Sequence, residues 1–183
     1  MTELEKRFAW AIKYNDIFSI KKCLEQGVDV NVNPYTGRSP LANAISFAND
    51  FELVEVLIEA GADLFYRSEE HQCNLLHIAI ECADDLYRDK QDGYTSYGSI
   101  ENKQPYLDEY DVPEFEAYLK THGFKNLDAL IADNHKVIML LLEAGVSLTD
   151  KDTLGHTPLS HIVYNDPLRE LLTAYLQQQK QSS

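Results

Sequence analysis

Residues 37–63 read GRSPLANAISFANDFELVEVLIEAGAD and carry the clearest structural pattern in the chain. Ser39 can accept a hydrogen bond from a free N–H of a first helical turn, and Pro40 comes next, where a missing donor costs nothing. Apolar residues recur at helical spacing over residues 41–45 and again over residues 53–58. Gly61 follows the last apolar turn, where helices commonly end in a left-handed residue. The stretch therefore predicts two short helices between a turn and a glycine stop.

The same ending occurs three times in the chain. Gly27, Gly61 and Gly145 each follow an apolar helical pattern, and Gly27 lies 34 residues before Gly61. The next interval, from Gly61 to Gly145, is 84 residues, which is about 50 too many for one repeat of about 33 residues. We therefore expect an insertion of about 50 residues, over residues 84–133, between the two helices of the third unit.

These units resemble ankyrin repeats, a family with a Thr-Pro-Leu-His start and a Leu-Leu-x-x-Gly-Ala ending. Here the start is Ser39-Pro40-Leu41-Ala42, and the ending is Leu57-Ile58-Glu59-Ala60-Gly61-Ala62. The resemblance implies an all-α solenoid of about four helix-turn-helix repeats with short hairpin fingers. It also implies a single domain, 1–183, with repeats at about 1–34, 35–70, 71–151 and 152–178.

The terminal units depart from the pattern in the manner of capping repeats. The first unit lacks the Thr/Ser-Pro start, and the fourth has Thr157-Pro158-Leu159 but no glycine ending. We expect Thr157 to cap a helix, Leu159 to be a core residue, and the polar tail from Gln177 onward to be frayed. His77 occupies the family's histidine position, which implies that it bonds the backbone between neighbouring repeats.

Composition limits the partners. The net charge is −14 and the pI is about 4.7, so nucleic acid and anionic membranes would be repelled, whereas a basic protein would be attracted. The three cysteines form no disulfide framework, no signal-peptide core follows the N-terminus, and no apolar run is long enough to span a membrane. These features predict a cytoplasmic protein.

The expected insertion is rich in tyrosine and acid. Residues 84–133 contain twelve acidic and five basic residues, and six of the eleven tyrosines of the chain. Residues 113–120 and 126–131 are expected to be helical, and residues 91–99 to form a loop. Two interpretations stay open: an acidic lid whose aromatic residues pack on the repeats, or a surface that contacts a partner through tyrosine anchors and carboxylates.

Metal and catalytic sites are not expected. His71, Cys73, His77 and Cys82 have a spacing that matches no zinc pattern, so we predict no metal ligands and no cofactor. Asp63, Asp84 and Asp85 lack a partner nucleophile, and Ser160-His161 lacks a nucleophile elbow. We therefore predict a protein that is not an enzyme.

In the family that the chain resembles, the finger tips and the first helices bind other proteins. Carried onto this sequence, with the insertion added, the candidate partner-binding residues are Tyr14, Tyr35, Arg38, Phe47, Glu70, His71, Glu81, Tyr94, Tyr97, Tyr106, Asp108, Glu109, Tyr110, Thr153, His156 and Tyr164. Lys13, Ser46 and Asn165 are expected to be exposed on the same face.

The resulting hypothesis is a protein–protein interaction module for a basic partner, similar to bacterial immunity-type ankyrin proteins that block a toxin. The alternatives are an enzyme or small-ligand binder with a pocket between the insertion and the repeats, and a host-directed effector or scaffold.

Overall fold

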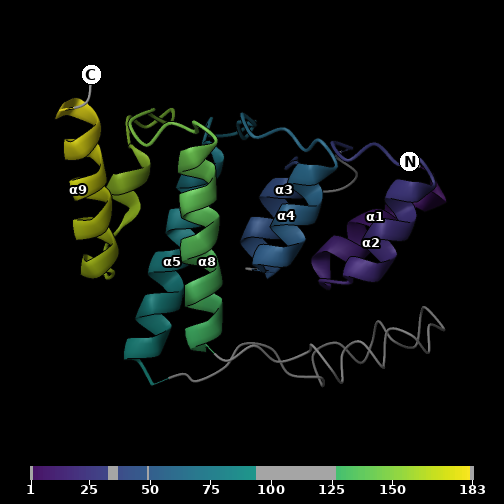
Figure 1. The fold of residues 1–183 in the computed structure, drawn as a ribbon, viewed down its shortest axis with the longest axis horizontal. Helices are drawn as coiled ribbons and strands as arrows, with labels where there is room; N and C mark the ends of the chain where they lie inside the picture. The colour runs from purple at the N-terminus through teal and green to yellow at the C-terminus, as the bar shows by residue number, and fades with distance from the viewer. Residues whose placement is uncertain (1, 33–36, 49, 94–126, 182–183) are drawn as a thin grey trace.

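The structure is a computed structural model that describes residues 2–32, 37–48, 50–93 and 127–181 (Figure 1). Its helices are α1 Glu3–Lys13, α2 Ile17–Glu25, α3 Pro40–Asn43, α4 Phe51–Glu59, α5 Leu75–Gln91, α8 Leu127–Glu143 and α9 Asp166–Gln181. A π-helical turn, Ala44–Ala48, continues α3, and a 3₁₀ turn, Pro158–His161, precedes α9. No strand occurs in these ranges apart from one isolated bridge between Arg67 and Asn74, which confirms the all-α class.

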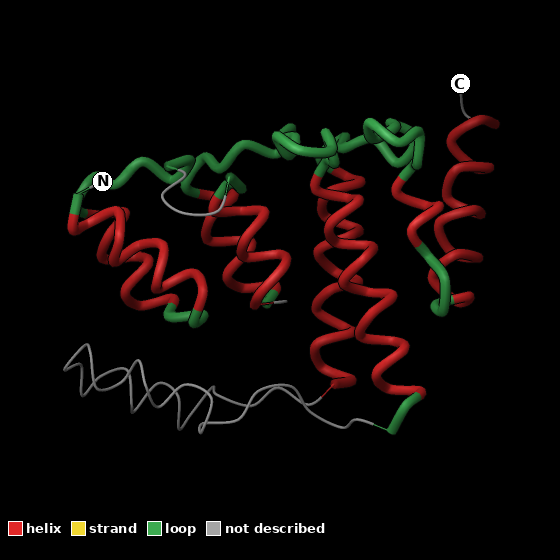
Figure 2. Tube along the Cα trace, turned by 180° about the vertical axis from the view of Figure 1, so that it is seen from behind, coloured by secondary structure: helices red, strands yellow, loops and turns green. Residues whose placement is uncertain are grey.

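The helices form stacked pairs. α1 packs on α2, the α3 turn on α4, and α5 on α8, while the connecting loops follow one edge of the stack (Figure 2). Neighbouring pairs meet in register: α1 contacts α3, α2 contacts α4, and α4 contacts α8. This arrangement confirms the predicted solenoid of helix-turn-helix repeats.

The predicted glycine stops have the same geometry in three repeats. Gly27, Gly61 and Gly145 adopt φ values of 85°, 91° and 86°, in the left-handed region that an L side chain rarely occupies. The residue after each glycine donates its N–H to a carbonyl five positions back, as in Ala62 N to Leu57 O at 3.0 Å. This bond satisfies a carbonyl that the helix leaves free, and α2, α4 and α8 therefore end in the same way.

The helix starts agree with the sequence at one of the two predicted caps. The Ser39 hydroxyl accepts from Ala42 N at 3.2 Å, and in α5 the Asn74 side chain accepts from His77 N at 3.1 Å in the same way. Thr157 makes no side-chain capping bond, and it precedes only a single 3₁₀ turn. The prediction of a helix capped by Thr157 was therefore wrong.

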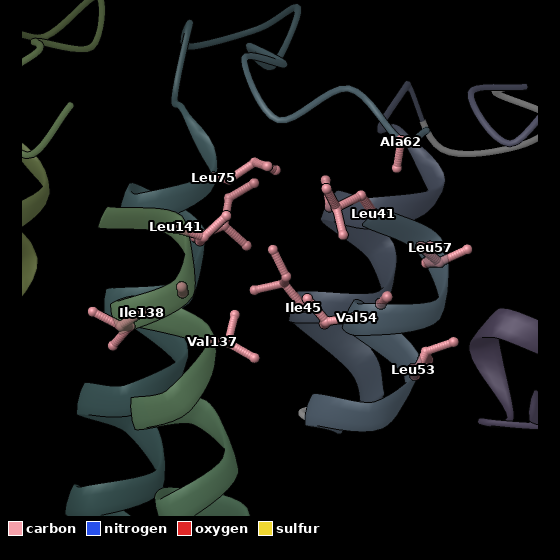
Figure 3. Packing of buried hydrophobic residues seen from close by; sticks show 14 of the residues in the cluster. Leu41, Ile45, Leu53, Val54, Leu57, Ala62, Leu75, Val137, Ile138 and Leu141 are labelled. Carbon is pink, nitrogen blue, oxygen red and sulfur yellow. The ribbon is translucent and has the colours of Figure 1, made fainter. Parts of the chain in front are cut away.

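One hydrophobic core runs through the stack. Between the second and third repeats, Leu41, Ile45 and Val54 face Leu75 and Val137, and each is no more than 1% exposed (Figure 3). Burying one such side chain stabilises the fold by about 1.5–3 kcal/mol. Because each repeat buries its apolar face on the next, the repeats fold as one stack.

Among the described helices, the longest are those of the third repeat, with 17 residues each in α5 and α8. α5 continues to Gln91 and α8 already begins at Leu127, so both ends of the expected 84–133 insertion are helical. Leu86, Leu127 and Leu130 form a small second cluster between these extensions. The residues expected to form the central part of the insertion, 94–126, lie outside the described ranges.

The C-terminal repeat differs from the expectation in three respects. Leu159 is only partly buried, and Asn165, expected to be exposed, is 1% exposed because its side chain caps α9 by accepting from Leu168 N at 3.1 Å. α9 continues to Gln181, so the expected frayed tail is helical over most of its length. Asp84 of α5 connects this repeat to the stack, since its Oδ1 accepts from the N–H groups of Tyr164 and Asn165, each at 2.8 Å.

Candidate functional site

Direct bonds between successive fingers hold the loop edge together. The Tyr66 hydroxyl donates to Gly37 O at 2.9 Å, and Thr153 N donates to His71 O at 2.9 Å. The Arg67 guanidinium forms an ion pair with Asp150 of the following finger. The finger tips are therefore fixed relative to the first helices beneath them.

A pocket of about 410 Å³ opens between these fingers and the start of α5. We call it the finger pocket. It is lined by Gly37, Arg38, Ser68, Glu69, Glu70, His71, Cys73, His77, Ile78, Glu81, Asp152, Leu154, His156 and His161.

His77 forms the floor of the finger pocket and braces two repeats. Asn74 N donates to its Nδ1 at 3.2 Å, and its Nε2 lies 3.1 Å from the carbonyl oxygen of His156. The neutral tautomer with the proton on Nε2 satisfies both contacts. Burial lowers the pKa of His77, which outweighs the raising effect of the bond to His156 and keeps the ring neutral. The role expected from the family position is thus confirmed.

Asp152 organises the last finger. Its Oδ1 accepts from the N–H groups of Leu154 and His156, each at 2.8 Å, and its side chain is 3% exposed. Burial by itself raises the pKa of Asp152, but these two hydrogen bonds and the nearby imidazoles outweigh it, so the pKa lies below its usual range. Its Oδ2 faces His156 Nδ1 at 3.7 Å and His161 Nε2 at 3.8 Å.

Carboxylates outnumber permanent cations around the finger pocket. Glu69, Glu70, Glu81 and Asp152 line it, whereas Arg38 supplies the one guanidinium among the lining residues. Arg38 Nη1 donates to Ser46 Oγ at 3.0 Å, which turns the cation toward the π-helical turn. The arrangement can accept several hydrogen bonds from a cationic group, and Ile78 and Leu154 add apolar surface.

The structure gathers five of the predicted partner-binding residues in this pocket. Arg38, Glu70, His71, Glu81 and His156, which span more than a hundred positions of sequence, all line it.

The other described candidates lie elsewhere or at the margin. Thr153 is exposed and joins the pocket only through its bond to His71. Tyr14, the residue after α1, stacks on Trp10 with ring centroids 5.5 Å apart, so its ring packs against that helix. Tyr164 is 45% exposed and lies beside Arg88, at the end of the stack formed by the last repeat.

Several candidates fall beyond the described part of the chain. Tyr35, Tyr94, Tyr97, Tyr106, Asp108, Glu109 and Tyr110 lie outside the described residues, as does the side chain of Phe47. Both interpretations of the tyrosine-rich segment therefore stay open.

Sequence reasoning missed Asp152 and His161 as members of the site. Asp152 could have been found from the sequence, because an aspartate at the start of a finger turn can accept from the backbone N–H groups of the residues that follow it, here Leu154 and His156. His161 gives none, since its approach to His77, with ring centroids 5.3 Å apart, depends on how the third and fourth repeats stack.

The cysteines are poor candidates for chemistry. Burial, with smaller contributions from Glu81 and Asp85, raises the pKa of Cys82 to about 12, so its thiolate is scarce at neutral pH. Burial also raises the pKa of Cys73.

Comparisons with known proteins agree with the stacked geometry. The family model for ankyrin repeats (many copies) matches residues 8–58. YahD of Escherichia coli (strain K12), which is named as a putative ankyrin repeat protein, is 35% identical over 75 residues, covering 41% of this chain and 35% of YahD. The mitochondrial disaggregase of Bos taurus is 22% identical over 173 residues, covering 90% of this chain and 22% of that protein.

The chain therefore contains ankyrin repeats over residues 8–58, and the stacked helical pairs of the other described residues have the same architecture. It spans only 22% and 35% of the lengths of these two curated relatives. None of the described helices is long and apolar enough to cross a membrane.

Proposed function

We propose that this protein binds a basic partner protein through the finger pocket and the finger tips around it. The observation that carries the proposal is the convergence of Glu69, Glu70, Glu81 and Asp152 from two fingers and α5 on a pocket with one lining guanidinium. Ankyrin repeats are interaction modules, and the net charge of −14 adds a long-range attraction for a basic surface.

The two kinds of lining group have different roles in this proposal. Glu70 is largely exposed, with 85% of its side chain accessible, so it accelerates encounter more than it adds affinity. Ile78, Leu154 and the imidazole faces supply the contact area that a bound arginine or lysine stem would cover. Binding should therefore weaken with salt mainly through the association rate.

A finer proposal concerns the identity of the partner. The small acidic stack suits an inhibitor that covers a basic toxin enzyme in the cytoplasm, as immunity-type ankyrin proteins do. The same face would equally serve a host-directed effector or scaffold. A captured partner that arrests growth when expressed alone, and not when co-expressed with this protein, would support the inhibitor over the scaffold. The alternative of an enzyme or small-ligand binder requires a pocket between the insertion and the repeats, and residues 94–126 of that insertion lie outside the described residues.

The test uses two charge-reversal variants with equal net charge. Glu70→Lys/Glu81→Lys changes the finger pocket, whereas Glu55→Lys/Glu59→Lys changes exposed positions on α4. Each variant captures proteins from a lysate at low and high salt, and captured proteins are quantified by mass spectrometry. We expect basic proteins to be lost from the pocket variant and kept by the α4 variant.

Equal capture by the two variants would place the interaction outside the finger pocket. A captured set that is not basic, or one indifferent to salt, would refute the proposed partner chemistry.

A further inference from the structure

A group of metal-ligating atoms lies at the end of the finger pocket. One side-chain nitrogen each from His77 and His161 and a carboxylate oxygen of Asp152 lie within 4.8 Å of one another. His156 adds a fourth ligating side chain, with its Nδ1 3.7 Å from Asp152 Oδ2. Of His71, Cys73, His77 and Cys82, the possible metal ligands that lie close together in the sequence, only His77 belongs to this group.

The hydrogen bonds decide which members of the group are available. His77 already uses both ring nitrogens, accepting from Asn74 N and donating to the His156 carbonyl. Asp152 uses Oδ1 for two backbone N–H groups, and Oδ2 points to the imidazoles of His156 and His161. His161 Nε2 is buried and has no hydrogen-bond partner in the described structure. Asp152 Oδ2 thus faces the imidazoles of His156 and His161, whose ring centroids lie 5.9 Å apart.

The separations exceed a hydrogen bond and approach those of ligands that share an ion. Oδ2 lies 3.7 Å from His156 Nδ1 and 3.8 Å from His161 Nε2. Donor atoms of a tetrahedral zinc site with bonds of about 2.0 Å lie about 3.3 Å apart. The His156 side chain is 56% exposed, so it can rotate toward Asp152 and His161, while its backbone stays fixed by Asp152 and His77.

We propose that Asp152, His156 and His161 bind a divalent transition metal ion such as Zn²⁺. Imidazole nitrogen selects zinc and its neighbours over Mg²⁺ and Ca²⁺, which prefer oxygen. Three protein ligands leave a fourth position open toward the finger pocket, where water or a side chain of a bound protein completes the coordination. His77, through the His156 carbonyl, is a positioning residue.

The charge balance favours a cation at this position. Asp152 Oδ2 faces two imidazoles at 3.7 and 3.8 Å, and Glu81 adds a second carboxylate to the lining of the same pocket. Of the cationic groups around it, Arg38 donates to Ser46 and Arg67 pairs with Asp150. A divalent ion would neutralise a carboxylate whose side chain is 3% exposed.

The test uses the full chain with the metal ions themselves. Co²⁺ addition should produce visible absorption bands of a nitrogen-containing site, and Zn²⁺ titration by calorimetry should give a stoichiometry of one. Affinity should fall as the pH drops below about 6.5, because the ligand histidines must be deprotonated. Zn²⁺ should also raise the melting temperature, since it binds the folded chain.

The variants separate this site from other metal-binding positions. Asp152→Asn keeps an Oδ1 acceptor for the finger turn and removes the charged ligand atom, and His161→Gln removes a nitrogen ligand. Each should weaken Zn²⁺ binding by at least about tenfold. His71→Gln changes a histidine that lines the same pocket and lies 3.6 Å from Glu70, and should leave Zn²⁺ affinity unchanged.

Three results would overturn the proposal. They are the absence of Co²⁺ bands and Zn²⁺ heat in the folded wild-type chain, binding that Asp152→Asn and His161→Gln leave intact, and binding that His71→Gln weakens as strongly as His161→Gln. NMR signals of His161 and Asp152 that respond to pH but not to added Zn²⁺ would also overturn it. They would show that the two side chains form an ion pair and no metal site.

Discussion

Replacing Asp84 by alanine should loosen the C-terminal repeat. Asp84 is 5% exposed, and its Oδ1 accepts from Tyr164 N and Asn165 N, each at 2.8 Å. Leaving a buried donor without an acceptor costs about 1–3 kcal/mol. Asn165 is 1% exposed whereas Tyr164 is 45% exposed, so water can replace only the bond to Tyr164. Adding the loss of the second bond, about 1 kcal/mol, we expect a total loss of about 2–4 kcal/mol.

Thermal and urea unfolding would measure the loss, which corresponds to a melting temperature lower by about 4–16 °C in a chain of this size. Relative to the wild type, Asp84→Ala should accelerate hydrogen exchange more in α9 than in α4, because stability in a repeat stack is lost locally. Asp84→Asn is the isosteric comparison, and it should lose less because its side-chain oxygen still accepts both bonds.

The matched control is Asp85→Ala on the same helix. Asp85 is half exposed and forms an ion pair with Arg88 at 2.9 Å, so its removal should cost no more than about 1 kcal/mol. Equal destabilisation by Asp84→Ala and Asp85→Ala would refute the reasoning. So would unchanged exchange in α9 of Asp84→Ala.

Three further predictions concern the core, the thiols and pH. Leu57→Ala empties a fully buried site and should cost about 2–5 kcal/mol in urea unfolding, whereas Leu159→Ala, at a partly buried position, should cost less; equal losses would contradict the burial. Cys82, with its pKa raised to about 12, should resist iodoacetamide at neutral pH until the chain unfolds, as peptide mass spectrometry can show, and rapid labelling of folded protein would count against this. Because burial lowers the folded pKa of His77, the unfolded chain binds a proton that the folded chain does not, so the free energy of unfolding should fall as the pH drops below about 6.5. His135 is a second histidine of lowered pKa, so the comparison is made in a His135→Gln background. There, adding His77→Gln should reduce the dependence of the free energy of unfolding on pH. An unchanged pH dependence would exclude His77 as the cause.

Much of the stack could be predicted because its signals are local. A capping serine, a proline at the first helical position and a terminal glycine each act through backbone groups within one turn. These signals fixed α3, α4 and the ends of α2, α4 and α8. The same logic failed at Thr157, where the sequence motif is intact but only one 3₁₀ turn forms.

The candidate site was only partly predictable. The positions of Arg38, Glu70 and Glu81 follow from the repeat pattern, because equivalent residues of each repeat face the same side. The extension of α5 to Gln91 was missed, since the acidic run in this region was interpreted as the start of the insertion. The segment is helical because Leu86 meets Leu127 and Leu130 of α8, a contact that sequence spacing does not reveal.

The row of helical pairs could be inferred from the sequence, because hydrophobic period and helix caps act over a few residues. The hydrogen bond between His77 and His156, 79 positions apart, could not, and neither could the position of Asp152 and His161 in the same pocket. Those contacts depend on how one repeat lies on the next, which is set by the summed packing of buried side chains and by finger-to-finger bonds. No single motif encodes that sum.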